Sequence, residues 1–348
     1  MILFAEVPNF YATLEQARRV ELRDAALIVG GDPRKRGLVQ SASVAARLRG
    51  VRPGMAMKEA LALAPSAVTL PTDMAHYRDV SARLRGCLRA ELGALEPDAL
   101  ESAYLDVSQV TVPLEDLGAR AIVRVREALA LPLRVGIARV KFIARLAAEE
   151  ARGGEVLAVP ASRELDFLSP LAAERLPGVG PKTRRALAEL GAHTIGDVRA
   201  LDRATLERLL GNHGLRILAH AQGHEDFVIR GHRHPRSLSR EHTFDEPQID
   251  LGELWECLLR LAQLLGTSLL EQGLSGTRVA IKVRFDDQQQ TTRSHTPKTA
   301  IETTADIYQL GVTLLDRTAA GTRAVRLVGL SVAGLAPRAP NTQLDLFR

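Results

Sequence analysis

The chain has 348 residues, of which 46% are hydrophobic and 25% are charged. This is an ordinary composition for a globular protein, and the length predicts two or three domains instead of a single core. The formal net charge of +5 fits a nucleic-acid partner without establishing one. Two cysteines, Cys87 and Cys257, form no CxxC pair, so the sequence indicates neither a disulfide framework nor a zinc site.

The sequence carries no pattern typical of a secreted or membrane protein. Its first residues, MILFAEVPNFYATLEQ, lack the basic start and the long apolar run of a signal peptide. No later apolar run is long enough to span a bilayer. We therefore expect a cytoplasmic protein with no membrane contact.

The first half of the chain mixes short apolar runs with segments in which apolar residues recur at helical spacing. The apolar runs predict strands at 2–7, 103–107 and 133–137. The helical spacing predicts helices at 74–92, 115–131 and 141–150. Strands and helices in this mixed order predict an α+β fold.

The second half divides into a helical part and another mixed part. Residues 163–228 show no convincing strand, and the Arg- and His-rich stretch 229–240 predicts a linker. Residues 277–285 alternate between an apolar set and a basic set, which are Val279, Ile281, Val283 and Phe285 against Arg278, Lys282 and Arg284. This alternation predicts a half-buried strand with a basic outer face. Residues 325–332 predict a further strand, and 336–348 predict a loose, Pro-rich tail.

The string LPGVGPKTRRALAEL has the pattern of a helix–hairpin–helix element. Gly178 and Gly180 permit a tight turn, and Pro181 suits the first position of the next helix. Backbone N–H groups at such a helix start can bind a DNA phosphate, and Lys182 and Arg184 add positive charge beside them. The element indicates DNA binding without saying what happens to the DNA.

Several motifs, in order along nearly the whole chain, resemble those of Y-family DNA polymerases of the bacterial pol IV kind. FAEVPNFYA and ALESAYLDVS resemble the two palm motifs, and SASVAARLRGVRPGM resembles the fingers segment. VGIARVKFIARLAA resembles the palm segment that carries a triphosphate-binding lysine. LPGVGPKT resembles the thumb, while RSLSREHTF and RLVGLSVAGL resemble the entry and the last strand of the little finger.

The resemblance implies an α+β multidomain protein with the right-hand architecture of palm, fingers, helix–hairpin–helix thumb and little finger. The implied boundaries are 1–9 and 73–162 for the palm, 10–72 for the fingers, 163–228 for the thumb, 229–240 for a linker, 241–337 for the little finger and 338–348 for a tail. It also implies that the partner is primer–template DNA, so that the protein is nucleoid-associated, and we expect a monomer. The residues expected to contact DNA are Gly178, Gly180, Lys182, Arg184, Arg236, Arg240, Lys282 and Arg284.

The resemblance also implies a nucleotide site. Tyr11 matches the position whose ring lies under the sugar and excludes a 2′-hydroxyl group, and Phe10 supports it. Arg47 and Lys141 match the cations that bind the triphosphate, and Ser41 matches a hydroxyl donor to it. One position departs from the family pattern, because Val44 stands where a triphosphate-binding tyrosine is usual.

The expected metal site is altered. Family members bind two divalent ions with three carboxylates, and the matching positions here are Glu6, Glu101 and Ser102. Glutamate is longer than aspartate by about 1.5 Å, and magnesium demands near-octahedral geometry at about 2.0–2.1 Å. Ser102 brings no charge, while the carbonyl group of Val7 remains a candidate ligand. The resemblance therefore implies Mg²⁺ or Mn²⁺ as a cofactor at a site that has been weakened or lost.

Two interpretations follow from this set. In one, Glu6 and Glu101 still bind metal and a slow, error-prone polymerase remains. In the other, which we favour, the chain is a scaffold that binds DNA and recruits a second polymerase, as in the ImuB-like mutasome branch of the family. A helix–hairpin–helix nuclease or glycosylase is a more remote alternative, because no lysine nucleophile or metal cluster is evident near the hairpin.

The C-terminal tail resembles the bacterial sliding-clamp-binding peptide, whose pattern is Gln-Leu-(Ser/Asp)-Leu-Phe. The matching residues are Gln343, Leu344, Asp345, Leu346 and Phe347. Leu346 and Phe347 offer apolar anchors, and Gln343 offers amide hydrogen bonds. We therefore expect the sliding clamp as a second partner.

Overall fold

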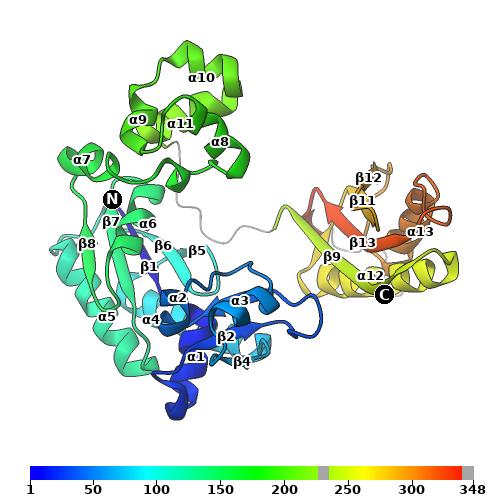
Figure 1. Cartoon of the computed structure of the whole chain (residues 1–348), viewed down its shortest axis with the longest axis horizontal. Coiled ribbons are helices and arrows are strands. Elements are labelled where there is room, and N and C mark those ends of the chain that lie inside the picture. Colours follow the sequence, from blue (N-terminus) through cyan, green and yellow to red (C-terminus); the bar gives the residue numbers. More distant parts are fainter. Residues whose placement is uncertain (226–234, 339–348) are drawn as a thin grey trace, which may run out of the picture. The chain divides into compact units, whose positions relative to one another are not determined.

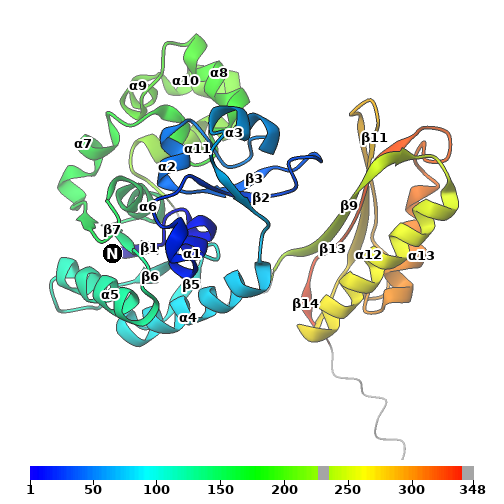
Figure 2. The same cartoon turned by 60° about the horizontal axis from the view of Figure 1, so that its bottom comes forward.

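The computed structural model describes residues 1–225 and 235–338. The chain divides into two compact units, Met1–Gly231 and His232–Arg348. Figures 1 and 2 show both units from two directions. The first unit contains the segments predicted as palm, fingers and thumb, and the second contains the segment predicted as the little finger.

The palm is a five-stranded sheet in the order β5-β6-β1-β7-β8. Its strands are β1 (Ile2–Glu6), β5 (Leu95–Pro97), β6 (Ser102–Asp106), β7 (Arg134–Ala138) and β8 (Val156–Ala158). The apolar strand β1 lies in the middle and pairs antiparallel with β6 and β7. The three strands and three helices predicted from residues 1–160 are all present, with ends that differ by a few residues.

Helices cover both faces of the palm sheet. Helices α4 (Met74–Leu92) and α5 (Leu114–Leu129) pack on one face, in a cluster with Leu3 and Ala5 of β1. Helix α6 (Lys141–Glu150) packs on the other face, where Ile2 and Phe4 join a cluster that continues into the thumb. Because side chains alternate along a strand, Glu6 lies on the α6 face with Ile2 and Phe4.

The fingers form a small sheet in the order β3-β2-β4, flanked by short helices. The strands are β2 (Leu27–Gly30), β3 (Val39–Ala42) and β4 (Val68–Leu70), and the helices are α1 (Phe10–Arg18), η1 (Val20–Leu22), α2 (Val44–Leu48) and α3 (Met57–Leu63). The start of α1 directly follows β1, so the fingers begin beside the end of the central palm strand.

The thumb is entirely helical in its described part, as predicted. Its elements are η2 (Ala161–Arg163), α7 (Glu164–Leu168), η3 (Ala173–Arg175), α8 (Pro181–Glu189), α9 (Ile195–Ala200), α10 (Arg203–Leu210) and α11 (Asn212–Ala221). Two of these helices begin with strong side-chain caps. Thr194 and Asp197 form a capping box on α9, and Asp202 accepts from the backbone of Thr205 on α10.

The second unit is a four-stranded antiparallel sheet in the order β12-β11-β13-β9. The strands are β9 (Ser237–Gln248), β11 (Arg278–Phe285), β12 (Gln290–His295) and β13 (Val325–Ala333), and a small pair is formed by β10 (Leu274–Ser275) and β14 (Ala336–Pro337). Helices α12 (Leu251–Glu271) and α13 (Thr304–Leu315) lie along one face of the sheet (Figure 2). The predicted alternation of β11 is confirmed, because Val279, Ile281, Val283 and Phe285 are all buried on the helix side.

Two predicted boundaries are wrong. The linker was predicted to extend to residue 240, but β9 begins at Ser237 and pairs there with Ala333. The loose tail was predicted to begin at residue 336, but β14 pairs with β10, and Arg338 forms an ion pair with Glu302 at 2.8 Å. In both places a short polar or Pro-containing stretch is ordered by pairing with a strand that is distant in sequence, which local patterns do not show.

Candidate active site and nucleic-acid interface

The register of the palm sheet brings the altered acids together. Glu6 at the end of β1 lies opposite Ser102 on β6 and opposite Arg134 on β7. Directly opposite residues of antiparallel strands point to the same face. Just beyond the strands, the backbone N–H of Val7 donates to the carbonyl group of Glu101 at 3.0 Å. The backbones of Glu6, Glu101 and Ser102 therefore lie together at one end of the inner palm strands, with Glu6 and Ser102 on the same face.

Glu6 is bound by an arginine that the sequence analysis did not single out. Nη2 of Arg134 donates to both carboxylate oxygens of Glu6, at 3.2 and 3.1 Å, and both side chains are only 18% exposed. Nη1 of Arg134 donates to the carbonyl group of Glu149 on α6 at 3.2 Å. Burial raises the pKa of Glu6, and Arg134 opposes this by stabilising the charged form.

Ser102 faces a second ion pair. It is 5% exposed, and its hydroxyl group donates to Asp98 at 3.4 Å. Asp98 pairs with Arg145 of α6 at 3.4 Å, and Arg145 also pairs with Glu149 at 3.1 Å. The acid nearest to the Ser102 hydroxyl is therefore already neutralised by a cation from α6.

The aromatic residues expected beneath the nucleotide sugar lie at the start of α1. Tyr11 is half-buried and stacks on Tyr77, with ring centroids 4.5 Å apart and planes 10° apart. Phe10 is buried beside it. The hydroxyl group of Tyr77 donates to Glu15 at 2.8 Å, which fixes the ring beneath Tyr11. Burial, and after it the nearby Glu101 carboxylate, raise the pKa of Tyr11, so Tyr11 lies near Glu101.

The predicted triphosphate ligands all have partners within the protein. The Ser41 hydroxyl donates to the carbonyl group of Asn9 at 3.1 Å and accepts from the N–H of Ala12 at 3.2 Å. Arg47 donates to the side chain of Asn9. Lys141 is 5% exposed and pairs with Glu96 at 2.8 Å. Ser41 and Arg47 are thus brought together at the start of α1, whereas Lys141 is the first residue of α6.

Comparison with known proteins decides the family. Residues 6–149 match the impB/mucB/samB family, and residues 235–346 match the C-terminal domain of that family. The chain is 33% identical over 350 residues to DNA polymerase IV of Desulfatibacillum aliphaticivorans, covering 100% of this chain and 88% of that relative. The chain belongs to the Y family of DNA polymerases. DNA polymerase IV of Listeria monocytogenes serotype 4b is also similar, with 31% identity over 97% of this chain and 95% of the relative.

Solved Y-family structures share the fold. A Y-family DNA polymerase chimera of Dbh and Dpo4 superimposes with a TM-score of 0.85 at 22% identity, covering 96% of this chain and 98% of the chimera. DinB from Sulfolobus solfataricus gives a TM-score of 0.67 at 22% identity, covering 97% and 99% of the two chains. The predicted palm, fingers, thumb and little-finger architecture is therefore confirmed.

Y-family polymerases use divalent metal ions, but the residues at this site do not fit such ions. Within residues 1–225 and 235–338, no group of three or more His, Cys, Asp or Glu residues is arranged to hold a metal. Glu6 is bound to Arg134, and Ser102 supplies no charge. Two like unit charges 4 Å apart repel by about 4 kcal/mol near a protein surface, and a divalent ion roughly doubles this. An ion on Glu6 therefore meets the guanidinium group of Arg134 as a direct competitor.

The thumb hairpin has the geometry expected of a phosphate site. Gly178 has a φ of 89°, which a glycine adopts without strain, and Gly180 precedes α8 with extended backbone. The turn therefore requires a glycine at position 178 but not at position 180, whereas the sequence analysis expected both glycines to be needed for it. Pro181 occupies the first turn of α8, and the N–H groups of Lys182 and Thr183 have no partner within the helix, whereas that of Arg184 donates to the carbonyl group of Gly180 at 2.8 Å.

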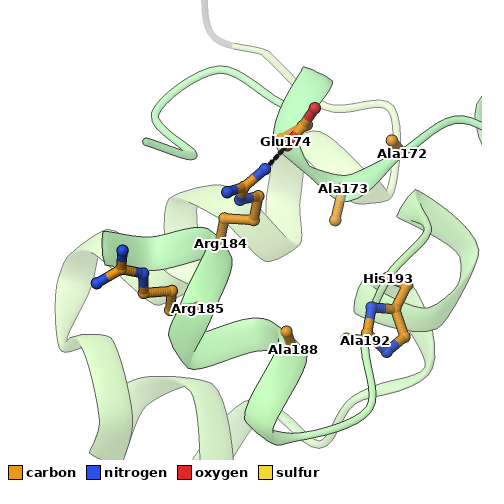
Figure 3. A pocket seen from close by; sticks show the side chains of 8 residues that line it. All are labelled: Ala172, Ala173, Glu174, Arg184, Arg185, Ala188, Ala192 and His193. Atoms are coloured by element: carbon orange, nitrogen blue, oxygen red, sulfur yellow. Dashed lines mark hydrogen bonds and ion pairs between the residues drawn. The ribbon is translucent and has the colours of Figure 1, made fainter. Parts of the chain in front are cut away.

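The charged side chains of α8 differ in their availability. Lys182 and Arg185 are exposed. Arg184 forms an ion pair with Glu174 at 2.8 Å, at the rim of a hollow of about 460 Å³ beside α8 (Figure 3). In Figure 3 Arg185 points away from this pair. The second thumb turn, between α10 and α11, packs against the first, because the ring of His213 bonds to the carbonyl group of Gly178 at 3.0 Å.

The open face of the second unit carries part of the predicted basic set. Lys282 and Arg284 point to the face opposite the helices, where Lys282 pairs with Glu241 at 2.8 Å. Glu241 reaches Lys282 across Gly329, which lies between them in the register and has no side chain to block the path. Arg236 is exposed just before β9.

Arg240 lies on the other face of the same sheet. It is opposite the buried Leu330 in the register, and its guanidinium group donates to Ser268 of α12 at 3.0 Å. The structure thus separates Arg240 from Lys282 and Arg284, which the sequence analysis had grouped together as DNA contacts.

Arg134 and Asp98 are the site residues that the sequence analysis missed. Each residue directly precedes a motif that carries the family resemblance, ALESAYLDVS for Asp98 and VGIARVKFIARLAA for Arg134, but neither residue belongs to its motif. A strand beginning near residue 133 was predicted, yet only the register shows that Arg134 faces Glu6. The predicted clamp-binding residues, Gln343 to Phe347, lie outside the described residues. Among the helices of the described ranges, none has the length and apolar character needed to cross a membrane.

Proposed function

We propose that this chain is a Y-family polymerase-like protein of translesion synthesis and DNA damage-induced mutagenesis whose own catalysis is weak or lost. It binds primer–template DNA and the sliding clamp, and acts as an adaptor for a second polymerase. The observation that carries the proposal is the ion pair between Glu6 and Arg134 in the place where two divalent ions are expected. As a DNA-bound protein it would be nucleoid-associated in the cytoplasm.

Two further features support this proposal. Ser102 takes the position of the third acid, and its neighbour Asp98 is paired with Arg145. The parts that grip DNA in the family keep their chemistry, with a hairpin ending at the free start of α8 and a basic open face on β11. A chain that retains these parts while Glu6 is paired with Arg134 and a serine replaces the third acid is suited to binding DNA without extending it.

Primer extension on a primed template, first with Mg²⁺ and then with Mn²⁺, tests the proposal. We expect extension at or near background in Mg²⁺, while fluorescence anisotropy shows intact binding to the same DNA. A DNA polymerase IV relative assayed in parallel serves as the positive control. Robust extension in Mg²⁺ that Glu101→Ala abolishes would refute the adaptor function.

The alternative is an active, error-prone polymerase that uses Glu6 and Glu101 as metal ligands. It is favoured by the adjacency of these two residues and by the stacked Tyr11–Tyr77 pair, which would still exclude a 2′-hydroxyl group. Strong preference for deoxynucleotides over ribonucleotides in the extension assay, lost in Tyr11→Ala, would establish this function. Absence of any extension with DNA binding intact would exclude it.

The clamp interaction is tested separately by deleting residues 343–348. We expect the deletion to abolish binding to a bacterial sliding clamp, because it removes both apolar anchors, Leu346 and Phe347, together with Gln343. Affinity for primer–template DNA should remain nearly unchanged, since the expected DNA contacts lie elsewhere. Unaltered clamp binding by the deletion variant would show that the tail is not the clamp-binding segment.

A further inference from the structure

We infer that Arg134 is an internal cation that takes the place of a divalent ion at Glu6, and that its charge is what excludes metal from this palm. The inference rests on the proposed function and deepens it, by naming the residue that decides the state of the site. It concerns the chain's own side chains and needs no nucleotide.

The position of Arg134 is set by the backbone and not by a chance side-chain rotamer. β7 pairs with β1 so that residue 134 lies directly opposite residue 6. With a side-chain period of two residues along a strand, any side chain at position 134 faces the same side as Glu6. The sheet therefore fixes residue 134 on the same face as Glu6, in reach of its carboxylate.

Arg134 is also fixed at its far end. One nitrogen bonds both oxygens of Glu6, and a second nitrogen bonds the carbonyl group of Glu149 on α6. At 18% exposure it has little room to swing into solvent. A divalent ion approaching Glu6 would have to displace a cation that is anchored on two elements.

The charges at the site agree with this role. Glu6 and Glu101 bring two negative charges, and Arg134 cancels one of them. Ser102 contributes none, and the nearby Asp98 is paired with Arg145. Glu149 also lies near Glu6, but it is paired with Arg145 and Arg175. Within the part of the chain that the structure describes, Glu101 is then the one carboxylate of this set without a cation partner, and its single charge is too little to neutralise even one divalent ion.

The direct test compares Arg134→Gln with Arg134→Lys in the full-length protein. Glutamine can still donate a hydrogen bond to Glu6 but removes the charge, whereas lysine keeps the charge. Free Mn²⁺ is measured by electron paramagnetic resonance during titration. We expect Arg134→Gln to bind Mn²⁺ at least about tenfold more tightly than Arg134→Lys and the natural chain, which corresponds to about 1.4 kcal/mol. Arg120→Gln, which removes an arginine paired with Glu91 between helices of the same palm, is the matched control and should leave Mn²⁺ affinity unchanged.

The same comparison is made in a background with the family acids restored, Glu6→Asp, Glu101→Asp and Ser102→Glu. Here too, Mn²⁺ should bind at least about tenfold more tightly when Arg134 is replaced by Gln than when it is retained. Equal affinity with and without Arg134 in this background would overturn the inference, as would equal affinity of the Gln and Lys variants in the natural background. Should Arg134→Gln fail to fold in the natural background, the restored background decides alone.

The outcomes separate this inference from the proposed function. Robust primer extension by the natural chain would refute the adaptor function, whatever the Mn²⁺ titrations show. An inert natural chain whose Arg134→Gln variant gains no Mn²⁺ affinity would leave the adaptor function standing and refute the role of Arg134.

Discussion

Two ion pairs of the palm, Arg134–Glu6 and Lys141–Glu96, are buried more deeply than the Arg184–Glu174 pair of the thumb. In the palm, Arg134 and Glu6 are each 18% exposed, and Lys141 and Glu96 are 6% and 18% exposed. In the thumb, Arg184 and Glu174 are 57% and 50% exposed. Both regions match parts of a polymerase that should bind negatively charged ligands or their counter-ions, yet of these three pairs only the thumb pair lies open to solvent.

The difference in burial determines which of these ion pairs can exchange one partner for a ligand. An exposed ion pair contributes about 0–1 kcal/mol, so a DNA phosphate can replace Glu174 at little cost. Removing one partner of a buried pair costs about 3–5 kcal/mol, because the other charge is left without compensation. A phosphate should therefore displace Glu174 from Arg184 more easily than a metal ion displaces Arg134 from Glu6.

The largest expected effect is on stability. Arg134→Ala should lower the free energy of unfolding by roughly 3 kcal/mol, because it leaves the largely buried Glu6 carboxylate without a counter-ion. We place the loss at the lower end of the usual range because Nε of Arg134 is itself buried without a hydrogen-bond partner among the described residues. Arg184→Ala, the matched variant in the thumb, should cost less than about 1 kcal/mol. Urea-induced unfolding followed by circular dichroism measures both.

The dependence on pH sharpens this test. The pKa of Glu6 is already raised by burial, and losing Arg134 raises it further in the folded state. A carboxyl group whose pKa is higher in the folded state than in the unfolded state stabilises the fold while it is protonated. This stabilisation is lost as the pH rises through the folded pKa. The deficit of Arg134→Ala should therefore be largest at neutral pH and shrink as the pH falls toward about 4.3, the ordinary pKa of a glutamate. A deficit that is independent of pH would show that packing, not charge, is what Arg134 contributes.

A second comparison separates the two glycines of the thumb hairpin. Gly178→Ala should cost about 1 to 2 kcal/mol of stability, because residue 178 has a positive φ. A Cβ there would also lie 2.9 Å from Cε1 of His213. Gly180→Ala should leave stability nearly unchanged, because the backbone there is extended and a Cβ would meet nothing within 4 Å.

The two glycine variants should rank in the opposite order for DNA affinity, measured per folded molecule: Gly180→Ala should lose more affinity than Gly178→Ala, although it loses less stability. The open space beside Gly180 lies at the start of α8, where a phosphate would approach the backbone N–H groups. Gly180→Ala should therefore weaken DNA binding severalfold in anisotropy titrations without lowering stability. Unchanged affinity in Gly180→Ala would show that this hairpin does not touch DNA backbone.

The sequence predicted the features that depend on neighbouring residues of one segment better than those that depend on pairing between distant segments. The strand containing Glu6, the helix that begins at Lys141 and the alternation on β11 follow from spacing alone, and all were predicted. The ends of β9 and the pairing of β14 depend on partners far along the chain, and both were mispredicted. Local patterns show which side chains of a strand share a face, but they do not show which other strand pairs with that strand.

The candidate site shows the same limit. The resemblance located Glu6, Glu101 and Ser102, and the register brings them together. Arg134 was missed because its importance comes only from lying opposite Glu6, 128 residues away in sequence. The pairing of Lys141 with Glu96 was missed for the same reason, since a lysine in a family motif gives no sign of which acid it will contact.

The smallest expected effect distinguishes the two faces of the second unit. Arg284 lies on the open face of the sheet, whereas Arg240 lies on the helix face and bonds Ser268. If the open face meets DNA phosphates, Arg284→Ala should reduce the slope of log affinity against log salt concentration by about 1. Arg240→Ala should leave that slope unchanged, because its guanidinium group is engaged on the other side of the sheet. Equal slopes for the two variants, measured by anisotropy across a salt series, would show that the open face is not the DNA-binding face.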